Sequence, residues 1–394
     1  MRFRSLISIL LLFTAASLSA QHGKTAPATL PGKSNPTGKQ VYRKVKTDDL
    51  QNINEVYHLN GTPFTGTSID MFPNNTKMQE IQWVNGLLDG TKTEYFLGGT
   101  QIRTIMHFRA GKRNGNFIFY YENGKLKLTG KYVDDLLDST VNAYWENGNM
   151  KYIHEYAMGV RVGKTITYYN NGNLEQEVAL KNEKPHGLML TYYEAGNIRL
   201  KSNYNEGVRD GQYLRYHLTG LVAEESYYKN GFQDSVARYW DNVFGSIMKE
   251  EYFKMGKKEG VWLTFNEAGD TLTMYTYHND QLDGPYKKYF SGVIDEGDQN
   301  NGKDEVYDPS KAKKRYVRAL DEIGNYAEGK LDGEFKTGLY NKANHAEGTY
   351  AMGSMIGEWK YYNEKGKVVL HEKYNENGEL IYQKPKLQPL KSDD

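Results

Sequence analysis

Residues 111–132 read GKRNGNFIFYYENGKLKLTGKY, and most of the chain consists of variants of this stretch. We number each copy from its second glycine, which is Gly115 here. The equivalents of this position zero are Gly66, Gly90, Gly115, Ser139, Gly163, Gly187, Gly211, Ser235, Gly260, Gly284, Gly333 and Gly357. Glycine occupies position zero in ten of twelve copies, which indicates a structural requirement common to the copies.

The copies follow one another at a nearly constant spacing. Successive zero positions lie 24 or 25 residues apart, except for the 49 residues between Gly284 and Gly333. The long interval predicts one degenerate copy, which brings the total to about twelve to thirteen. A fixed period of this size over most of a chain is typical of a repeat array, in which each unit packs mainly against its neighbours.

Each copy has the pattern of a β-hairpin. Position five is aromatic in ten copies, position nine is usually glycine, and in the best copies asparagine precedes it, as in Asn123-Gly124. An Asn-Gly pair between two alternating segments predicts a two-residue type I′ turn. Such a turn pairs Gly115 with Tyr132, an aromatic position in most copies, and we expect the ring to cover the glycine backbone. Charged segments between glycines, such as GKRNG, return the chain to the next hairpin.

This register predicts what each face of a hairpin presents. Positions two, six, eleven and seventeen share one face, which in this copy carries Phe117, Tyr121, Leu126 and Tyr132. Position five points to the other face, opposite charged residues at position twelve such as Lys127. Neither face has the composition of a dry sandwich interior. The expected fold is therefore all-β, an elongated single-layer antiparallel meander of 24-residue hairpins.

The combination of turn glycines, a Tyr-Tyr pair, an Asn-Gly turn and a closing tyrosine resembles the MORN repeat. It is closest to the bacterial variant of the YwqK-type antitoxin repeat family, and the resemblance covers roughly residues 61 to 380. It implies a fold of hairpin repeats and a role in scaffolding or interaction. Ser139 and Ser235 depart from the pattern at position zero, and the interval after Gly284 interrupts it.

The order of segments along the chain suggests an exported protein. Arg2 and Arg4 precede an apolar run and a series of small residues ending at Ala20, which is the layout of a secretory signal peptide. The predicted organisation is a signal peptide at 1–20, a flexible leader at 21–40, N-terminal cap strands at 41–60, MORN-like repeats at 61–290, a charged insertion in a degenerate repeat at 291–325, further repeats at 326–380 and a disordered tail at 381–394. We expect a periplasmic or extracellular chain that is soluble after cleavage.

The charged insertion contains the only candidate metal ligands. Asp295, Asp298 and Asp304 offer oxygen atoms that suit a hard cation such as calcium, but their spacing does not match an EF-hand loop. A solvated surface loop is the favoured interpretation, and a metal site is the weaker alternative.

The composition excludes several classes of partner. The formal net charge of +1 provides no basic surface for nucleic acid, and the absence of cysteine excludes disulfides and a lipoprotein anchor. The sequence predicts no transmembrane segment. There is no HExxH, GxSxG or phosphate-loop motif, and the nine histidines do not recur at metal-ligand spacing. We therefore expect neither enzymatic activity nor a cofactor.

Two classes of function remain. The first is a non-catalytic exported scaffold that binds a protein partner in the cell envelope, and the alternative is carbohydrate or cell-wall binding by stacking on exposed rings. Both would use the aromatic stripe at position five, because aromatic side chains with polar surroundings are enriched at interfaces. The candidate binding residues are Tyr95, Tyr120, Tyr144, Tyr168, Tyr192, Tyr216, Trp240, Phe265 and Tyr289.

A second similarity, which we call the four-copy echo, has a longer period than the repeat. Asp138-Ser139 followed by Tyr144-Trp145 returns as Asp234-Ser235 followed by Tyr239-Trp240, which is 96 residues or four copies later. Duplication of a four-copy block explains the echo most simply, and a pair of matched binding spots is the alternative.

Overall fold

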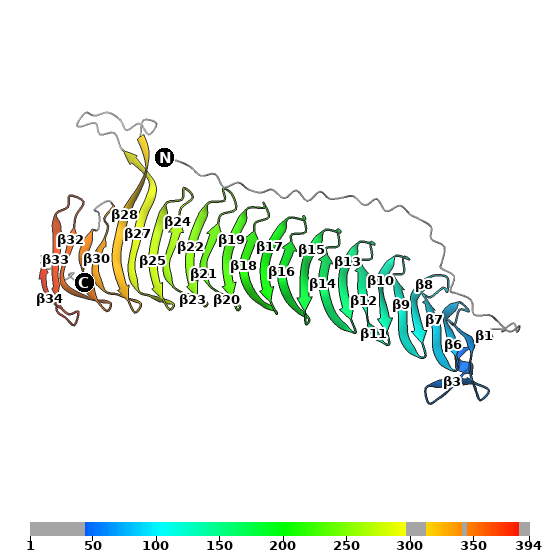
Figure 1. Ribbon diagram of the computed structural model, residues 1–394. Helices are drawn as coiled ribbons and strands as arrows, with labels where there is room; N and C mark the ends of the chain where they lie inside the picture. The colour runs from blue at the N-terminus through cyan, green and yellow to red at the C-terminus, as the bar shows by residue number, and fades with distance from the viewer. Residues whose placement is uncertain (1–43, 297–312, 341–344, 386–394) are drawn as a thin grey trace, which may run out of the picture. The chain divides into compact units, whose positions relative to one another are not determined.

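The structure is a computed structural model that describes residues 44–296, 313–340 and 345–385. These residues form one 31-stranded sheet and a separate three-stranded sheet, and they contain no α-helix. Figure 1 shows the strands of the large sheet side by side in chain order. The predicted all-β antiparallel meander of hairpin repeats is confirmed.

The short elements before the first repeat pack on the first hairpin. They are β1 (Lys44–Val45), the 3-10 turn η1 (Thr47–Asp49), β2 (Gln51–Ile53), β3 (Val56–Leu59) and β4 (Thr62–Pro63). Strand β1 pairs in parallel with β5, whereas β2, β3 and β4 form the small antiparallel sheet. Leu50 and Phe64 from this segment form an apolar cluster with Ile81 and Trp83 of the first hairpin.

The large sheet continues through the repeats, whose strands are bounded as follows. The first part comprises β5 (Gly66–Met71), β6 (Lys77–Val84), β7 (Leu87–Tyr95), β8 (Ile102–Arg109), β9 (Lys112–Tyr120), β10 (Leu126–Val133), β11 (Leu136–Leu137), β12 (Ser139–Tyr144), β13 (Met150–Ala157), β14 (Val160–Tyr168), β15 (Leu174–Lys181), β16 (Lys184–Tyr192), β17 (Ile198–Asn205) and β18 (Val208–Tyr216). The second part comprises β19 (Val222–Lys229), β20 (Phe232–Gln233), β21 (Ser235–Trp240), β22 (Ile247–Lys254), β23 (Lys257–Lys258), β24 (Gly260–Phe265), β25 (Thr271–His278), β26 (Gln281–Leu282), β27 (Gly284–Glu296), β28 (Lys313–Ala327), β29 (Lys330–Leu331), β30 (Gly333–Thr337), β31 (Ala346–Ala351), β32 (Ser354–Tyr362), β33 (Val368–Tyr374) and β34 (Leu380–Lys384).

The hairpin turn differs from the predicted two-residue type I′ turn. The Tyr121 N–H donates to the Lys125 carbonyl and the Gly124 N–H donates to the Tyr121 carbonyl, so the loop has three residues. Only Gly124 has a positive φ, of 80°, as in a type I turn followed by a left-handed residue. The Asn123 side chain accepts a hydrogen bond from the Lys125 N–H instead of adopting the left-handed conformation itself.

A β-bulge next to this turn restores the predicted register. Tyr120 pairs with Leu126 but Phe119 pairs with Leu128, so Lys127 is the extra residue. The three-residue loop shifts the pairing by one residue and the bulge shifts it back. Gly115 therefore pairs with Tyr132 as predicted, although the turn type was wrong.

Position zero is glycine for a different reason from the predicted ring contact. Gly163 has a φ of +63°, and a Cβ there would lie 1.9 Å from the Glu155 carboxylate on the preceding strand. The two serines at this position keep the left-handed conformation, with φ of 94° at Ser139 and 70° at Ser235. The left-handed backbone conformation thus favours glycine at this position, and at Gly163 the closeness of the preceding repeat adds to it.

Rings do cover small residues, but at positions two and fifteen. Phe117 pairs with Gly130, and a Cβ on that glycine would lie 2.6 Å from the Phe117 ring. Tyr286 covers Gly324 in the same way. Most of the buried side chains occupy these two positions, among them Ser68, Phe117, Thr165, Val178, Ser202, Ser226, Ala237, Tyr286 and Trp359. One face of the single layer therefore carries the core of the array.

Side chains at position six join each repeat to the next. The Tyr121 hydroxyl donates to the Tyr144 carbonyl at 2.9 Å, and the Trp145 indole N–H donates to the Tyr168 carbonyl at 3.1 Å. The same bond recurs from Tyr169 to Tyr192, from Tyr193 to Tyr216 and between His217 and Trp240, at 2.8 to 3.1 Å. Five consecutive repeats are thus connected by ring donors to backbone acceptors of the following repeat.

The interval between Gly284 and Gly333 contains one lengthened hairpin where the sequence predicted an additional degenerate repeat. Strands β27 and β28 pair from Gly284 opposite Tyr326 to Glu296 opposite Lys313. Tyr326 therefore occupies the place of the closing tyrosine, and the inserted residues extend the two strands of a single repeat. Figure 1 shows this pair of strands extending beyond its neighbours.

Candidate functional site

The nine candidate residues at position five occupy equivalent places in the sheet. Each lies at or near the end of the first strand of its hairpin, and each is half-buried. Because side chains alternate along a strand, position five lies on the opposite face from the buried residues at position two. We call this side of the sheet the stripe face. The rings thus follow one another along one face, and each is partly accessible.

The bulge changes which residues lie across from the stripe. Tyr192 pairs with Ile198 at position eleven, whereas Arg199 at position twelve is the extra residue of the bulge. The prediction that position five lies opposite the charged position twelve is therefore wrong, as is the placement of position eleven with position six. The charged side chain at position twelve lies near position six instead, since the Lys151 ammonium is 4.4 Å from the centre of the Trp145 ring.

Charged groups reach the stripe from position fourteen of the preceding repeat. The Tyr192 hydroxyl donates to the Glu177 carboxylate at 2.8 Å, and the Lys164 ammonium lies 2.6 Å from the same carboxylate. The hydrogen bond from Lys164 lowers the pKa of Glu177, and the Tyr192 hydroxyl acts in the same direction. Burial and the bond to Glu177 raise the pKa of Tyr192 to about 12. The tyrosine therefore remains a neutral donor at physiological pH.

A similar arrangement recurs near the C-terminal end of the sheet, with the glutamate and the tyrosine at the same repeat positions but the lysine at position three instead of position one. The Tyr362 hydroxyl donates to Glu347 at 2.5 Å, and the Lys336 ammonium lies 3.7 Å from that carboxylate. The hydrogen bond from Tyr362 is the main cause of the lowered pKa of Glu347, and it raises the pKa of Tyr362 to about 12. We call each set, Lys164–Glu177–Tyr192 and Lys336–Glu347–Tyr362, a Lys–Glu–Tyr cluster.

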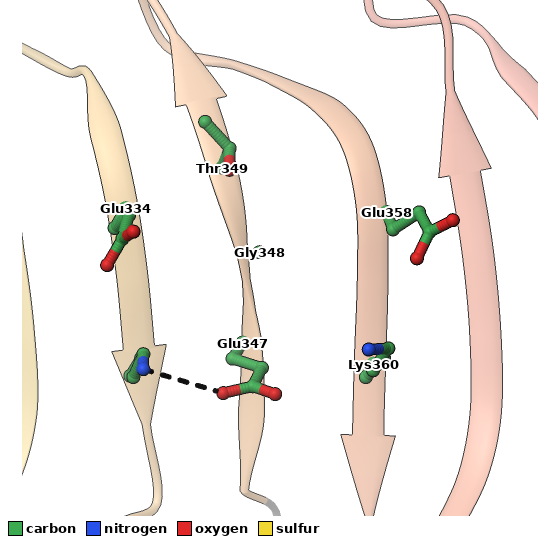
Figure 2. A pocket seen from close by; sticks show the side chains of 7 residues that line it. Glu334, Glu347, Gly348, Thr349, Glu358 and Lys360 are labelled. Carbon is green, nitrogen blue, oxygen red and sulfur yellow. Dashed lines mark ion pairs between the residues drawn. The ribbon is translucent and has the colours of Figure 1, made fainter.

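An open hollow lies next to each cluster, at the same position in the repeat. The first has a volume of about 310 Å³ and is lined by Lys164, Glu177, Ala179, Leu188 and Leu190, among others. The second has a volume of about 210 Å³ and is lined by Glu334, Lys336, Glu347, Thr349, Glu358 and Lys360, together with Gly348. Figure 2 shows the carboxylates of this second hollow on three neighbouring strands. The first hollow is partly apolar, whereas the second is lined by charges of both signs.

Cations cover several other rings of the stripe. The Lys77 ammonium lies 5.5 Å from the centre of the Tyr95 ring, and the Lys201 ammonium lies 5.6 Å from that of Tyr216. The Arg318 guanidinium is 4.3 Å from the Tyr289 ring centre. Such contacts are favourable because the face of an aromatic ring carries negative charge density. The stripe is therefore a mixed aromatic and charged surface, with part of its ring area already occupied.

The predicted metal candidates lie mostly outside the described part of the chain. Asp298 and Asp304 lie outside the described residues, and Asp295 lies on β27 opposite Lys314. Among residues 44–296, 313–340 and 345–385, no group of three or more His, Asp or Glu side chains is arranged to hold a metal ion. The predicted signal peptide at 1–20 also lies outside the described residues.

The sequence analysis missed the inter-repeat role of position six. A signal was available, because this position holds tyrosine, tryptophan or histidine in the five consecutive repeats that are linked, and each of these rings carries a hydrogen-bond donor. An apolar contact alone would accept phenylalanine equally well. The missing phenylalanine in these five repeats therefore indicated a hydrogen bond.

The fold and the stripe together define a β-hairpin repeat protein with an extended, repeated surface. The family model of the MORN repeat variant matches residues 113–134, 161–182 and 185–206. Each matched segment begins two residues before position zero and contains one complete hairpin. The chain therefore contains MORN-type repeats, and MORN repeats generally serve as modules for interaction with proteins or membranes.

Two further comparisons concern curated proteins and solved structures. No curated protein matches the chain. Among solved structures, the chain is similar to "Crystal Structure of TcdB2-TccC3-Cdc42", with 11% identity and a TM-score of 0.16, over 80% of this chain and 18% of that one. For "Crystal Structure of TcdB2-TccC3-TEV" the values are 9%, 0.16, 85% and 19%. The chain thus spans less than a fifth of these proteins, and a likeness at this level carries no argument.

The described residues contain no helix with the length and hydropathy needed to span a bilayer.

Proposed function

We propose that this protein is a non-catalytic scaffold that binds a protein partner along the stripe face. The observation that supports this most directly is the recurrence of the Lys–Glu–Tyr cluster beside a hollow in two repeats, with the glutamate, the tyrosine and the hollow at equivalent repeat positions. A recurring site suits a ligand that extends along the sheet, whereas catalysis requires one convergent set of groups. Aromatic side chains are also enriched at protein interfaces.

The proposed location is the cell envelope, outside the cytoplasm. This part of the proposal rests on the sequence of residues 1–20, with two arginines, an apolar run and small residues before Gln21. The absence of cysteine from the sequence is compatible with either side of the membrane and does not weaken it. Determination of the N-terminal residue of the mature protein tests the proposal, and we expect Gln21.

Carbohydrate binding is the second candidate function. It is less favoured than protein binding because cationic side chains already cover several rings of the stripe. Sugar stacking needs open ring faces, but Lys77, Lys201 and Arg318 already lie over three rings of the stripe. The hydroxyls of Tyr192 and Tyr362 are also engaged by carboxylates. Partly exposed rings beside charged groups favour a peptide over a sugar.

The experiment compares capture of partners by two matched variants. The stripe variant replaces Tyr144, Tyr168 and Tyr192 by serine, and the control replaces surface residues of the same repeats on the hairpin turns, Glu146, Asn170 and Glu194, by serine. Each is incubated with envelope extract, and bound proteins are identified by mass spectrometry. A specific partner should be lost with the stripe variant and retained by the control.

Circular dichroism of both variants establishes that the sheet is intact. Retention of the partner by a folded stripe variant would contradict the proposed surface. Titration with soluble cell-wall oligosaccharides separates the second candidate, since a sugar that binds the wild type and not the stripe variant would favour it over the scaffold.

A further inference from the structure

Eight Asn-Gly pairs lie in the described part of the chain, and they differ in the hydrogen bonds that they make. Their asparagines are Asn60, Asn85, Asn114, Asn123, Asn147, Asn171, Asn230 and Asn377. Such a pair is chemically labile, because glycine has no side chain to hinder attack of its backbone nitrogen on the asparagine amide. The bonds made by these two groups therefore decide which pair reacts in the folded chain.

The pairs in the hairpin turns are held at both groups. The Asn147 side chain donates to the Asn170 carbonyl at 2.7 Å and accepts from the Asn149 N–H at 2.9 Å. The Gly148 N–H donates to the Trp145 carbonyl at 2.8 Å. The same three bonds recur in the turns of Asn123 and Asn171. Attack of the glycine nitrogen would have to break them first.

Two pairs between repeats are held at the glycine. Asn85-Gly86 and Asn230-Gly231 form two-residue turns in which both residues have a positive φ, as in type I′. The Gly231 N–H donates to the Arg209 carbonyl of the preceding repeat at 2.8 Å, and the Gly86 N–H donates to the Phe64 carbonyl at 2.7 Å. Packing against the preceding segment thus protects the glycine nitrogen.

Two further pairs each make one bond at these groups. The Asn114 side chain donates to the Asp134 carboxylate at 3.0 Å. The Gly378 N–H donates to the Asn375 carbonyl at 3.1 Å. Seven of the eight pairs are therefore held at the asparagine side chain, at the glycine N–H or at both.

Asn60-Gly61 is the remaining pair, and it is held at neither group. It forms the two-residue turn between β3 and β4, with φ of 51° and 77°. Figure 1 shows β3 at the N-terminal end of the large sheet. Within residues 44–296, 313–340 and 345–385, neither the Asn60 side chain nor the Gly61 N–H makes a hydrogen bond. Both residues are exposed, and a Cβ at Gly61 would meet no atom within 4 Å.

We propose that Asn60 is a site of spontaneous deamidation in the folded chain, and that its isoaspartate product loosens the packing of β3 and β4 on the first hairpin. The Gly61 nitrogen gives its proton to water and bonds to the side-chain carbonyl carbon of Asn60, and the side-chain nitrogen leaves as ammonia. Water then opens the cyclic imide at either of its carbonyl carbons. One route gives aspartate, and the other gives isoaspartate, whose main chain passes through the former side-chain carbon. Water is the only co-reactant.

The two products differ in their effect on the turn. Aspartate is compatible with it, since Asp-Gly is a preferred sequence of type I′ turns. Isoaspartate adds a carbon atom to the main chain of a two-residue loop, which disturbs the pairing of Leu59 with Thr62. Phe64 follows this hairpin and is 4% exposed, in the apolar cluster with Trp83. The modification therefore acts on the contact that covers the first repeat.

Peptide mapping of the intact folded chain tests the site. Incubation in mildly alkaline water enriched in heavy oxygen labels only the amides that are converted during the experiment. Asn60 should react at least about threefold faster than Asn230, whose turn is of the same type but whose glycine N–H is bonded. It should react at least about tenfold faster than Asn147, where three bonds must break.

Two outcomes of the mapping would overturn the assignment. Equal rates at Asn60 and Asn230 in the folded chain would show that the glycine bond does not protect. In urea the rates should become equal, because the turns are lost. A difference that persists in urea would come from local sequence and not from the structure.

A substitution that removes the amide tests the consequence. Asn60→Gly keeps a sequence suited to the turn and has no amide to lose. Hydrogen exchange is followed at the Tyr57 and Phe64 amides, which donate to the Gly86 and Tyr57 carbonyls at 2.8 Å. Incubation should accelerate their exchange at least about threefold in wild-type molecules that carry isoaspartate, and should leave it unchanged in Asn60→Gly.

Fresh Asn60→Asp separates the added charge from the altered main chain. Its exchange should equal that of fresh wild type, because aspartate keeps the turn. Acceleration in fresh Asn60→Asp would assign the effect to charge and contradict the isoaspartate mechanism. Unchanged exchange in wild type that carries isoaspartate would overturn the claim that the modification loosens β3 and β4.

Discussion

Removing two of the position-six hydrogen bonds tests whether these bonds join consecutive repeats. The substitutions Tyr169→Phe and Tyr193→Phe keep both rings and remove only the hydroxyls, which donate to the Tyr192 and Tyr216 carbonyls at 2.8 Å. A hydrogen bond of this kind contributes about 0.5–1.5 kcal/mol net. The pair should therefore lower the local free energy of opening by about 1–3 kcal/mol in total.

Hydrogen exchange detects this loss at the hairpin turns that directly follow the two accepting carbonyl groups. The Tyr193 N–H bonds the Asn197 carbonyl, and the His217 N–H bonds the Leu221 carbonyl, both at 2.8 Å. Loss of about 0.5–1.5 kcal/mol at each turn accelerates exchange of these amides by roughly 2- to 13-fold. A local measurement is preferable because a repeat array need not unfold in one step.

A neighbouring tyrosine provides the matched control. Tyr168 is at position five, and its hydroxyl has no hydrogen-bond partner among the described residues. Tyr168→Phe should therefore leave exchange at both turns unchanged. If the control accelerates exchange as much as Tyr169→Phe and Tyr193→Phe do, or if none of them does, the hydroxyl bonds do not join the repeats as we infer.

Three further predictions concern glycine and charge. Ser139→Gly should raise the melting temperature, since it removes strain worth about 1 kcal/mol at a φ of 94°; a lower value would contradict this. Gly348→Ala should lower the melting temperature more than Gly187→Ala does. A Cβ at Gly348 would lie 2.2 Å from the Trp359 ring, whereas a Cβ at Gly187 meets nothing within 4 Å and is disfavoured only by the φ of 83°. The reverse order of melting temperatures would exclude the packing argument. Because its folded pKa is lowered from 4.5, Glu177 contributes stability that is complete above that value and is lost as pH falls through the lower folded pKa. Hydrogen exchange in β15 should therefore differ between Glu177→Gln and wild type at pH 7, and the difference should vanish in acid.

The period of the sequence predicted the fold, and two compensating errors preserved its register. The spacing of position zero fixed the length of a hairpin and the pairing of Gly115 with Tyr132. The turn type was wrong, because Asn-Gly is compatible with a three-residue loop as well as with a type I′ turn. The bulge at Lys127 cancelled the resulting shift, but it exchanged the faces of positions eleven and twelve. Bulges leave little trace in a sequence, so the faces near the turn could not be predicted.

The candidate site was predicted only as a row of rings. The sequence placed Tyr192 and Tyr362 at the same repeat position, but it could not show that each bonds a glutamate of the preceding repeat. Those contacts depend on how adjacent hairpins are offset, which the period alone does not give. The sequence also did not show that Asp138 and Asp234 of the four-copy echo accept hydrogen bonds from the Met158 and Met255 N–H groups.

The connections at position six have a direction, and this direction suggests an order of folding. In each case the donor belongs to the earlier repeat and the acceptor to the later one, as for Tyr121 and Tyr144. A chain synthesised or exported from its N-terminus presents a finished hairpin, with its donor already placed, before the acceptor emerges. In that order, each new hairpin would complete the junction with its predecessor, and loss of C-terminal repeats would leave the earlier junctions intact.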